Sequence, residues 1–470
     1  MCRLIESDFA QSRIVGMPVA LDELIAAIGD SGVLTDPDVV ERYRQDWARD
    51  PDAGRPLAVV RARSTEDVQT TLRWASQHRV PVVPRGAGSG LSGGATAVDG
   101  GIVLTTELMR DIHVDPVSRV AVVEAGLLNA EVKRAVAEHG LWYPPDPSSF
   151  EMCSIGGNAA TNAGGLCCVK YGVTTDYVLG MQVVLADGTA LRLGGPRLKD
   201  VAGLSLTKLF VGSEGLLGVI TELTLRLVPA PPPASTLVAV FNSVEDAADA
   251  VLAITRELRP CMLELMDRTS INAVEDMVTM GLDRSAEALL VARSDAPGAA
   301  AGAEIATMEA ACRINGATEL FSTDDPDEGE AFAAARRAAF PALERLGSLL
   351  LEDVGVALPA LPSLVKGIEE IAAKQGVTIA VVAHAGDGNT HPIVVFNAAD
   401  PDETARAYVA FGAVMDLAIE LGGTITGEHG VGRLKKDWLP AYLGDDVMAL
   451  TRRIKDALDP LGILNPGAVL

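Results

Sequence analysis

Short apolar runs separated by turn residues dominate the first half of the chain and predict strands alternating with helices. Leu57–Arg61 and Ile102–Thr105 are compact and rich in β-branched residues, as buried strands are. Between them, a capping serine followed by two acidic residues opens a predicted helix from Ser64 to about His78. Further elements are expected at 22–28, 37–43, 80–83, 112–114, 120–125 and 129–139, with a hairpin over 178–193 turning at Asp187-Gly188.

A proline-rich run at 229–234 marks a domain boundary, and the pattern changes after it. Strands are predicted at 237–241, 262–266, 288–293 and 318–321, with helices at 244–258 and 299–312. This alternation is typical of an α+β module with its helices on one face of a small sheet. An alanine-rich helix from Glu328 to Phe340 is expected to end at Pro341, and a strand-like run follows at 349–356. The predicted divisions of the chain are 1–50, 51–230, 231–425 and 426–470.

Composition and charge narrow the function classes. The 470 residues are 48% hydrophobic and 22% charged, which indicates globular domains with buried cores. A formal net charge of -24 argues against nucleic acid and anionic lipid as partners. No apolar run is long enough to span a membrane, and acidic residues stand where a signal peptide would be apolar, so a cytoplasmic protein is expected. Residues 1–16 are interpreted as an extension or as lying upstream of the natural start.

The six cysteines, at 2, 153, 167, 168, 261 and 312, have neither CxxC nor zinc-ribbon spacing. We expect reduced, mainly buried thiols. The same pattern offers no ferredoxin-type cluster motif, so any electrons would leave through a soluble acceptor or another protein.

The densest glycine stretch, PVVPRGAGSGLSGGATAVDGG at 81–101, predicts an anion-binding loop. Closely spaced glycines can adopt positive φ and bring backbone N–H groups up to phosphate. A dinucleotide fingerprint of the GxGxxG type would require a helix directly after Gly90, but a β-rich run follows. A plain flexible loop is the structural alternative, and Arg85 between two apolar strands favours the anion site.

Three of the six histidines lie in two C-terminal motifs and suggest a metal site. His384 and His391 flank a tight turn in HAGDGNTH, and Glu428 precedes His429 in GEHGVG. Two imidazoles and one carboxylate leave open positions on a divalent ion, as catalytic sites do. Each histidine alone could be a hydrogen-bonded loop residue, and a metal hydrolase would use the same cluster. His429 could instead act as a general base.

Two arginines on the alanine-rich helix are candidates for binding a carboxylate. Arg336 and Arg337 project about 100° apart, so at most one is expected to face a pocket. A solvated pair is the alternative. An inward guanidinium would clamp a carboxylate through two hydrogen bonds.

Five motifs in order resemble one family across residues 57–466: PRGAGSGLSGG, PPDPSS with IGGNAATNAGG, GSEGLLGVITE, HAGDGNTH and GEHGVG. They are similar to the FAD-linked oxidoreductases of the vanillyl-alcohol oxidase / p-cresol methylhydroxylase (PCMH) superfamily. The branch resembled contains the glycolate oxidase D subunit, cytochrome-type D-lactate dehydrogenases and D-2-hydroxyglutarate dehydrogenase. The resemblance implies an α+β fold: a helical N-terminal segment, a PCMH-type two-subdomain FAD-binding domain, an α+β cap domain and a C-terminal segment returning to the flavin.

The resemblance also implies roles for individual residues. FAD, held without a covalent bond since residues 81–101 contain no histidine, would contact Pro84, Arg85, Gly86, Ala87, Gly88, Ser89, Gly90, Pro145, Asp146, Ser149, Gly156, Gly157, Asn158, Asn162, Gly218, Ile220 and Asn465. A divalent metal, Zn²⁺ or else Mn²⁺ or Fe²⁺, would bind His384, His391 and Glu428. His429 would be the catalytic base, and Arg336 would hold the substrate carboxylate.

The implied reaction is oxidation of a D-2-hydroxy acid to the 2-oxo acid, with hydride passing from C2 to flavin N5. Leu351 and Ile393 stand where the hydroxyglutarate branch carries lysine and asparagine, and Phe340 replaces a smaller hydroxylated residue. An unpaired second carboxylate there would be costly, which favours D-lactate, glycolate or a longer apolar monocarboxylate. D-2-hydroxyglutarate remains the enzymatic alternative, and a flavin-binding partner subunit a further one. The expected electron acceptor is a quinone, a cytochrome or an electron-transfer flavoprotein, and a homodimer is compatible with the pattern.

Overall fold

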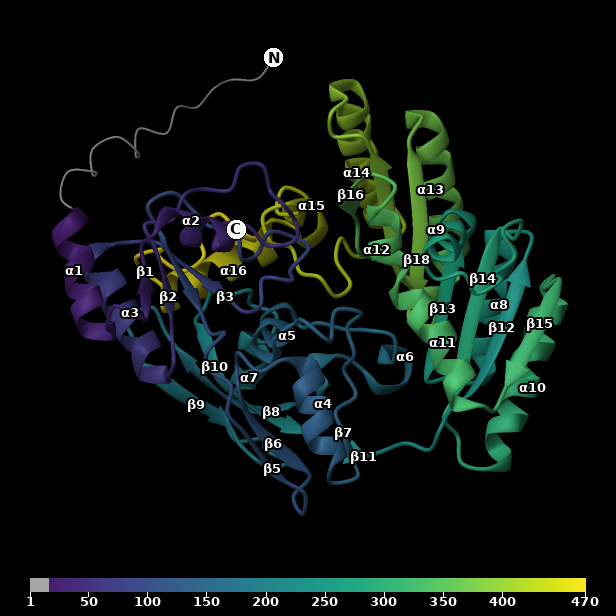
Figure 1. Ribbon diagram of the computed structural model, residues 1–470, viewed down its shortest axis with the longest axis horizontal. Helices are drawn as coiled ribbons and strands as arrows, with labels where there is room; N and C mark the ends of the chain where they lie inside the picture. The colour runs from purple at the N-terminus through teal and green to yellow at the C-terminus, as the bar shows by residue number, and fades with distance from the viewer. Residues whose placement is uncertain (1–16) are drawn as a thin grey trace.

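The computed structural model describes residues 17–470, so the expectations for residues 1–16 and for Cys2 lie outside the described residues. The chain forms two bodies, and its N-terminal and C-terminal segments both belong to the same one (Figure 1). No helix in the described range is long and apolar enough to cross a membrane.

The first body begins with a four-stranded sheet in the order β1-β2-β4-β3. Strands β2, β4 and β3 are parallel, so their carboxyl ends meet at one edge, where the glycine loop follows β3. Helices α1 and α3 bury apolar side chains, among them Leu24 and Leu72, in the same core. The elements are α1 (Met17–Ile28), β1 (Val33–Leu34), α2 (Pro37–Val40), the 3-10 turn η2 (Glu41–Tyr43), β2 (Ala58–Arg61), α3 (Thr65–His78), β3 (Val82–Arg85) and β4 (Ile102–Thr105).

A five-stranded antiparallel sheet, ordered β5-β6-β10-β8-β9, completes this body with its own core. The predicted hairpin is confirmed, since β8 pairs with β9 from Gly180 opposite Gly194 to Val184 opposite Ala190. The elements are β5 (Ile112–Asp115), β6 (Val120–Glu124), α4 (Asn129–Ala137), β7 (Leu141–Trp142), α5 (Ile155–Thr161), α6 (Cys168–Tyr171), η3 (Thr174–Asp176), β8 (Val178–Val184), β9 (Ala190–Gly194), α7 (Leu206–Phe210), β10 (Val219–Arg226) and β11 (Val228–Pro229).

The second body is an eight-stranded antiparallel sheet, larger than the sequence pattern predicted. Its order is β15-β12-β14-β13-β18-β19-β16, and β17 pairs with β19. The strands are β12 (Ser235–Phe241), β13 (Met262–Asp267), β14 (Ala288–Ser294), β15 (Glu319–Thr323), β16 (Ser348–Leu351), β17 (Val354–Gly355), β18 (Thr378–His384) and β19 (Asn389–Phe396).

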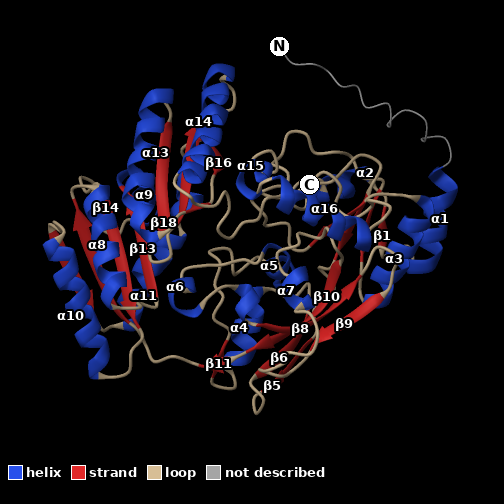
Figure 2. Ribbon diagram, turned by 180° about the vertical axis from the view of Figure 1, so that it is seen from behind, coloured by secondary structure: helices blue, strands red, loops and turns tan. Residues whose placement is uncertain are grey.

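Helices cover both faces of this sheet, so the expectation of helices on one face is wrong (Figure 2). Leu237 and Val238, neighbours on β12, enter different cores, which is the behaviour of a strand buried on both sides. One face carries α8 (Val244–Glu257), α10 (Ala299–Ile314), α13 (Leu361–Gln375) and α14 (Pro401–Glu420), and η4 (Leu358–Ala360) leads into α13. The other carries α9 (Arg268–Val278), α11 (Pro326–Arg337) and α12 (Ala339–Glu344).

Two predicted boundaries in this body also need correction. Helix α11 ends at Arg337, and Pro341 lies inside the first turn of α12, where the missing N–H of a proline costs no helical hydrogen bond. The predicted strand at 349–356 is divided into β16 and β17 at the buried acids Glu352 and Asp353.

After the sheet the chain returns to the first body through α15 (Leu439–Leu443) and α16 (Asp445–Leu458). The Val82 N–H donates to the Ile463 carbonyl, and the Asn465 N–H donates to the Val82 carbonyl, both at 2.8 Å. The C-terminal segment therefore extends the parallel sheet beside β3, as the predicted return requires.

Candidate active site

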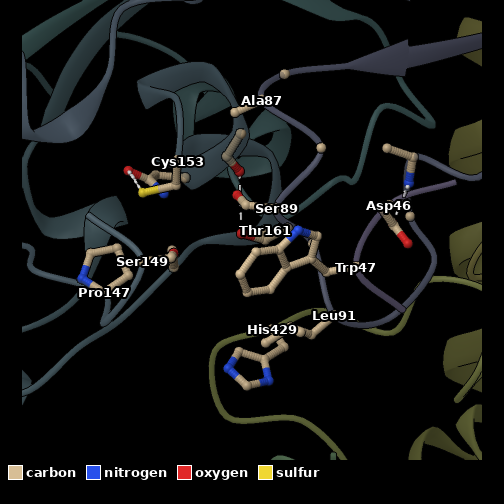
Figure 3. Close-up of a pocket in the computed structure, with 18 of the residues that line it drawn as sticks. Asp46, Trp47, Ala87, Ser89, Leu91, Pro147, Ser149, Cys153, Thr161 and His429 are labelled. Atoms are coloured by element: carbon tan, nitrogen blue, oxygen red, sulfur yellow. Dashed lines mark hydrogen bonds between the residues drawn. The ribbon is translucent and has the colours of Figure 1, made fainter. Parts of the chain in front are cut away.

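A cavity of about 460 Å³ is lined by residues of both bodies (Figure 3). The whole predicted stretch from Pro84 to Gly90 lines it, from the last two residues of β3 onward. Gly88 has a φ of +74°, which a residue with a side chain rarely adopts. The glycine loop thus lines the cavity, and its binding of an anion there stays a prediction.

The second glycine-rich patch lies against the first. Ser149, Gly156, Gly157 and Asn158 line the cavity, and so do Gly218 and Ile220 at the start of β10. The hydroxyl of Ser154, which caps α5, accepts the N–H groups of Ala87 and Gly157, both at 3.3 Å. One side chain therefore holds the two patches together around a shared space, which fits an extended ligand such as FAD.

Four predicted cofactor residues lie outside the cavity lining: Pro145, Asp146, Asn162 and Asn465. Asp146 accepts the backbone N–H of Cys167 at 3.0 Å, and Asn465 donates from its side-chain amide to the Glu214 carbonyl at 2.7 Å. Asn162 ends α5 in a left-handed conformation. In this structure these residues lie behind the segments that line the cavity, and the contacts of Asp146 and Asn465 stabilise those segments.

The predicted metal ligands come together at the end of a hairpin. His384 ends β18 and His391 lies on β19, so pairing of the two strands brings the rings to 5.0 Å between centroids. Glu428 Oε1 lies 3.0 Å from His384 Nε2 and 3.2 Å from His391 Nε2. Burial raises the pKa of the Glu428 carboxyl, but the two histidines lower it well below its usual value. Two imidazole nitrogens and a carboxylate oxygen within 4.8 Å of one another suit a divalent ion.

Buried carboxylates orient these ligands. Glu264 on β13 contacts His384 Nδ1 through both oxygens at 2.9 Å, which directs Nε2 toward Glu428. Asp353 Oδ2 accepts the backbone N–H groups of Gly427, Glu428 and His429 at 2.8 to 2.9 Å. The loop bearing Glu428 is therefore held in place by the eight-stranded sheet that also carries His384 and His391.

His429 lines the same cavity (Figure 3). Its ring stacks on that of His391, with ring centroids 4.9 Å apart. Burial lowers the pKa of His429 to about 4, although Asp353 opposes the shift. The ring is therefore neutral near pH 7 and can accept a proton. Its Nδ1 has no hydrogen-bond partner among residues 17–470.

Both arginines of α11 line the cavity, so the expectation that at most one would do so is wrong. The cavity extends past the end of the helix, where both side chains reach it. Arg336 is only 3% exposed; its Nε lies 3.0 Å from Glu264 Oε2, while Nη2 lacks a hydrogen-bond partner in the described chain. Arg337 is engaged by Glu330 at 2.7 Å and lies 3.9 Å from Asp146. Nε of Arg337 also lacks a hydrogen-bond partner in the described chain, but the Nη atoms of Arg337 face Glu330 and Asp146, whereas Nη2 of the more deeply buried Arg336 has no partner.

Apolar side chains close the rest of the cavity. Leu351 and Ile393, opposite each other on β16 and β19, both line it. Phe340 stacks on Trp47 with ring centroids 5.9 Å apart. Among the lining residues from the second body, only the two arginines and the histidine–glutamate cluster carry charge.

Sequence reasoning missed Glu264, Asp353, Glu214 and Trp47. Glu264 was detectable, since a carboxylate inside a strand as apolar as CMLELMD must be paired when buried. Glu214 accepts the N–H groups of Val431 and Gly432 at 2.7 and 2.8 Å, a contact that joins distant segments. Trp47 lies in an N-terminal segment with no motif, so no signal indicated that it reaches the cavity.

A two-part flavin-binding fold, a cap sheet and a shared cavity define the class of FAD-dependent oxidoreductases of the PCMH type. The comparisons with known proteins agree. The FAD-binding domain family matches residues 56–194, and the C-terminal domain family of FAD-linked oxidases matches residues 230–469. The chain belongs to the FAD-linked oxidases.

The chain is 42% identical to glycolate oxidase subunit GlcD of Bacillus subtilis, over 88% of each chain. It is 35% identical to a D-lactate dehydrogenase of Archaeoglobus fulgidus, over 89% of this chain and 93% of the relative. It is 34% identical to a D-2-hydroxyglutarate dehydrogenase of Xanthomonas citri, over 92% of this chain and 93% of the relative. The solved structure of p-cresol methylhydroxylase has the same fold, with a TM-score of 0.80 at 19% identity over 96% of each chain. The protein is thus an FAD-linked oxidoreductase, related to enzymes that are named for their action on 2-hydroxy acids.

Proposed function

We propose that the protein oxidises a D-2-hydroxy monocarboxylate, such as D-lactate, glycolate or a longer apolar homologue, to the 2-oxo acid. The observation that carries this proposal is the buried Arg336, whose unpartnered Nη2 lines the same cavity as His429. A guanidinium donor without a partner in a buried position is costly unless a ligand satisfies it. A carboxylate is the ligand that matches its geometry and charge.

In this proposal each residue has one task. Arg336 binds the substrate carboxylate and thereby orients C2. His429, neutral at working pH, accepts the proton of the 2-hydroxyl. Leu351 and Ile393 exclude water and charge from the substrate's far end. Bound FAD supplies the hydride acceptor, and a divalent ion supplies a Lewis acid.

The proposed holder of the divalent ion, most simply Zn²⁺ but also Mn²⁺ or Fe²⁺, is the set His384, His391 and Glu428. The donor chemistry supports it, because Glu428 Oε1 lies within 3.2 Å of one imidazole nitrogen of each histidine, and Glu264 orients the ring of His384. FAD without a covalent bond is proposed along the two glycine-rich patches. The division at 51–230, 231–425 and 426–470 is proposed as the flavin domain, the cap and the segment that completes the site.

D-2-hydroxyglutarate is the second candidate. It is favoured by one observation, the presence of Arg337 as a second cation on the cavity wall. The contacts of Arg337 with Glu330 and Asp146 leave it less free to bind a second carboxylate. Electrons are proposed to leave for a quinone, a cytochrome or an electron-transfer flavoprotein, in the cytoplasm, from a monomer or a homodimer.

The test is an anaerobic reaction of the purified flavoprotein before and after removal of metal with a chelator. The proposal predicts that D-lactate or glycolate reduces the flavin in the metal-loaded protein. The chelated protein should keep its flavin and lose the fast reduction, and Zn²⁺ or Mn²⁺ should restore it. Equal reduction rates in both forms would contradict the metal's role. A colourless protein with hydrolase activity would contradict the whole proposal.

A further inference from the structure

A second cavity, of about 480 Å³, reaches the proposed metal ligands from the other side. His384 lines this cavity and not the first, whereas His391 lines only the first. Glu428 lines both. The three proposed metal ligands therefore lie between the two cavities.

The two spaces differ in what occupies them during turnover. The first cavity is lined by the glycine-rich loops, Arg336 and His429, so flavin and substrate are expected to fill it. An ion that entered through the first cavity would have to pass the flavin and the substrate. The second cavity contains none of the residues predicted to bind flavin or the substrate carboxylate. Its wall includes exposed residues such as Asp387, Gly427 and Tyr442, so solvent reaches it.

The wall of the second cavity offers oxygen atoms to a cation along the way in. Asp387 is exposed at the turn between β18 and β19 and lies only three residues after His384. The side-chain oxygen of Asn389 has no hydrogen-bond partner among residues 17–470. Next to Glu428 Oε2 the wall is Gly164, and a Cβ there would lie 2.5 Å from that oxygen. The absence of a side chain at 164 keeps the approach to Glu428 open.

We infer that the second cavity is the route by which the divalent ion enters and leaves its site. Asp387 attracts the ion, Asn389 Oδ1 and Glu428 Oε2 are its first ligands, and His384 and His391 complete the set. The inference rests on the proposed metal role of Glu428. It separates metal exchange from catalysis, because the ion can exchange while flavin and substrate stay bound.

The test measures Zn²⁺ uptake by the metal-free, FAD-loaded protein and Zn²⁺ release from the loaded protein to a chromogenic chelator. Ala357, exposed on the wall of the second cavity, is replaced by Trp to narrow it. Met152, 43% exposed on the wall of the first cavity, is replaced by Trp as the matched control. Entry and exit share one path, so Ala357→Trp should slow uptake and release by the same factor, about tenfold, and leave Kd unchanged. Met152→Trp should change neither rate.

A second variant tests the attraction of the ion without adding bulk. Asp387→Asn should lower the Zn²⁺ uptake rate by about tenfold and weaken its dependence on ionic strength, with the release rate nearly unchanged. If wild-type protein binds no stoichiometric Zn²⁺, the proposed metal role fails. If it binds Zn²⁺ but Ala357→Trp and Asp387→Asn exchange it at wild-type rates, or Met152→Trp slows exchange instead, only the entry route is overturned.

Discussion

Replacing Arg336 by Lys separates the charge of this residue from its shape. Arg336 is buried, its Nε lies 3.0 Å from Glu264, and its Nη2 has no partner in the described residues. A lysine ammonium can still neutralise Glu264, so the fold should be kept. It cannot present two parallel donors to a substrate carboxylate. The variant therefore isolates the proposed clamp from the buried ion pair.

The size of the effect follows from the bonds lost. Each hydrogen bond to a charged group contributes about 1.5–3 kcal/mol, and Lys should keep one of the two that Arg makes to a carboxylate. Losing the other should lower kcat/KM by roughly 10- to 100-fold, since each 1.4 kcal/mol is a factor of ten. Substitution by Met should cost more, because Glu264 would then lose its guanidinium partner.

The assay is anaerobic flavin reduction at increasing D-lactate or glycolate, with flavin content and Tm measured on the same samples. Arg337→Lys is the matched control, since Glu330 and Asp146 already engage that guanidinium. It should change kcat/KM by less than about threefold, in line with the small contribution of partly exposed ion pairs. If Arg336→Lys keeps the wild-type kcat/KM, or Arg337→Lys is the more damaged variant, the assignment of the clamp is refuted.

Three further predictions concern the support of the site and its choice of substrate. Burial raises the pKa of Glu214 to about 7 from an ordinary 4.5. The folded state thus holds a proton on Glu214 that the unfolded state releases. Glu214 alone should therefore lower the unfolding free energy by about 3 kcal/mol between pH 4.5 and 7.5, and Glu214→Gln should reduce the pH dependence measured in urea titrations by that amount relative to wild type. Lys435→Met should lower the unfolding free energy by about 3–5 kcal/mol, because it leaves the buried Glu352, 3.1 Å away, unpaired. Adding Glu352→Gln to this variant should recover part of the loss. If the two substitutions instead lower the unfolding free energy additively, the pairing is contradicted. Leu351→Lys with Ile393→Asn should raise kcat/KM for D-2-hydroxyglutarate relative to D-lactate by about tenfold or more, and an unchanged ratio would show that these residues do not select the substrate.

Glycine spacing, helix caps and turn residues predicted those elements of the fold that are set by neighbouring residues in the sequence. The glycine loop after β3, the capped helix α3 and the hairpin of β8 and β9 all lie where spacing and turn residues indicated. The HAGDGNTH turn likewise brought His384 beside His391, because strand pairing across a short turn puts His384 opposite Asn389, two residues before His391 on the same face of the sheet.

Features that depend on distant segments were not predictable in this way. Glu264 reaches His384 only because β13 pairs with β18, and the pairing order of an eight-stranded sheet is not written in any one strand. Trp47 reaches Phe340 across the two bodies, a contact that depends on how the bodies pack together and not on either local segment. The two helix layers were missed since a strand buried on both faces gives no alternation to reveal its second covered face.

The central claim is that bound flavin takes a hydride from a D-2-hydroxy monocarboxylate. The most direct measurement is the anaerobic visible spectrum of the metal-loaded protein before and after addition of D-lactate or glycolate, with L-lactate and D-2-hydroxyglutarate as parallel additions. The account predicts a flavin band near ~450 nm that D-lactate or glycolate bleaches rapidly, while L-lactate and D-2-hydroxyglutarate leave it largely unchanged. Bleaching by D-2-hydroxyglutarate alone would contradict the proposed substrate class, and the absence of any flavin band would contradict the account as a whole.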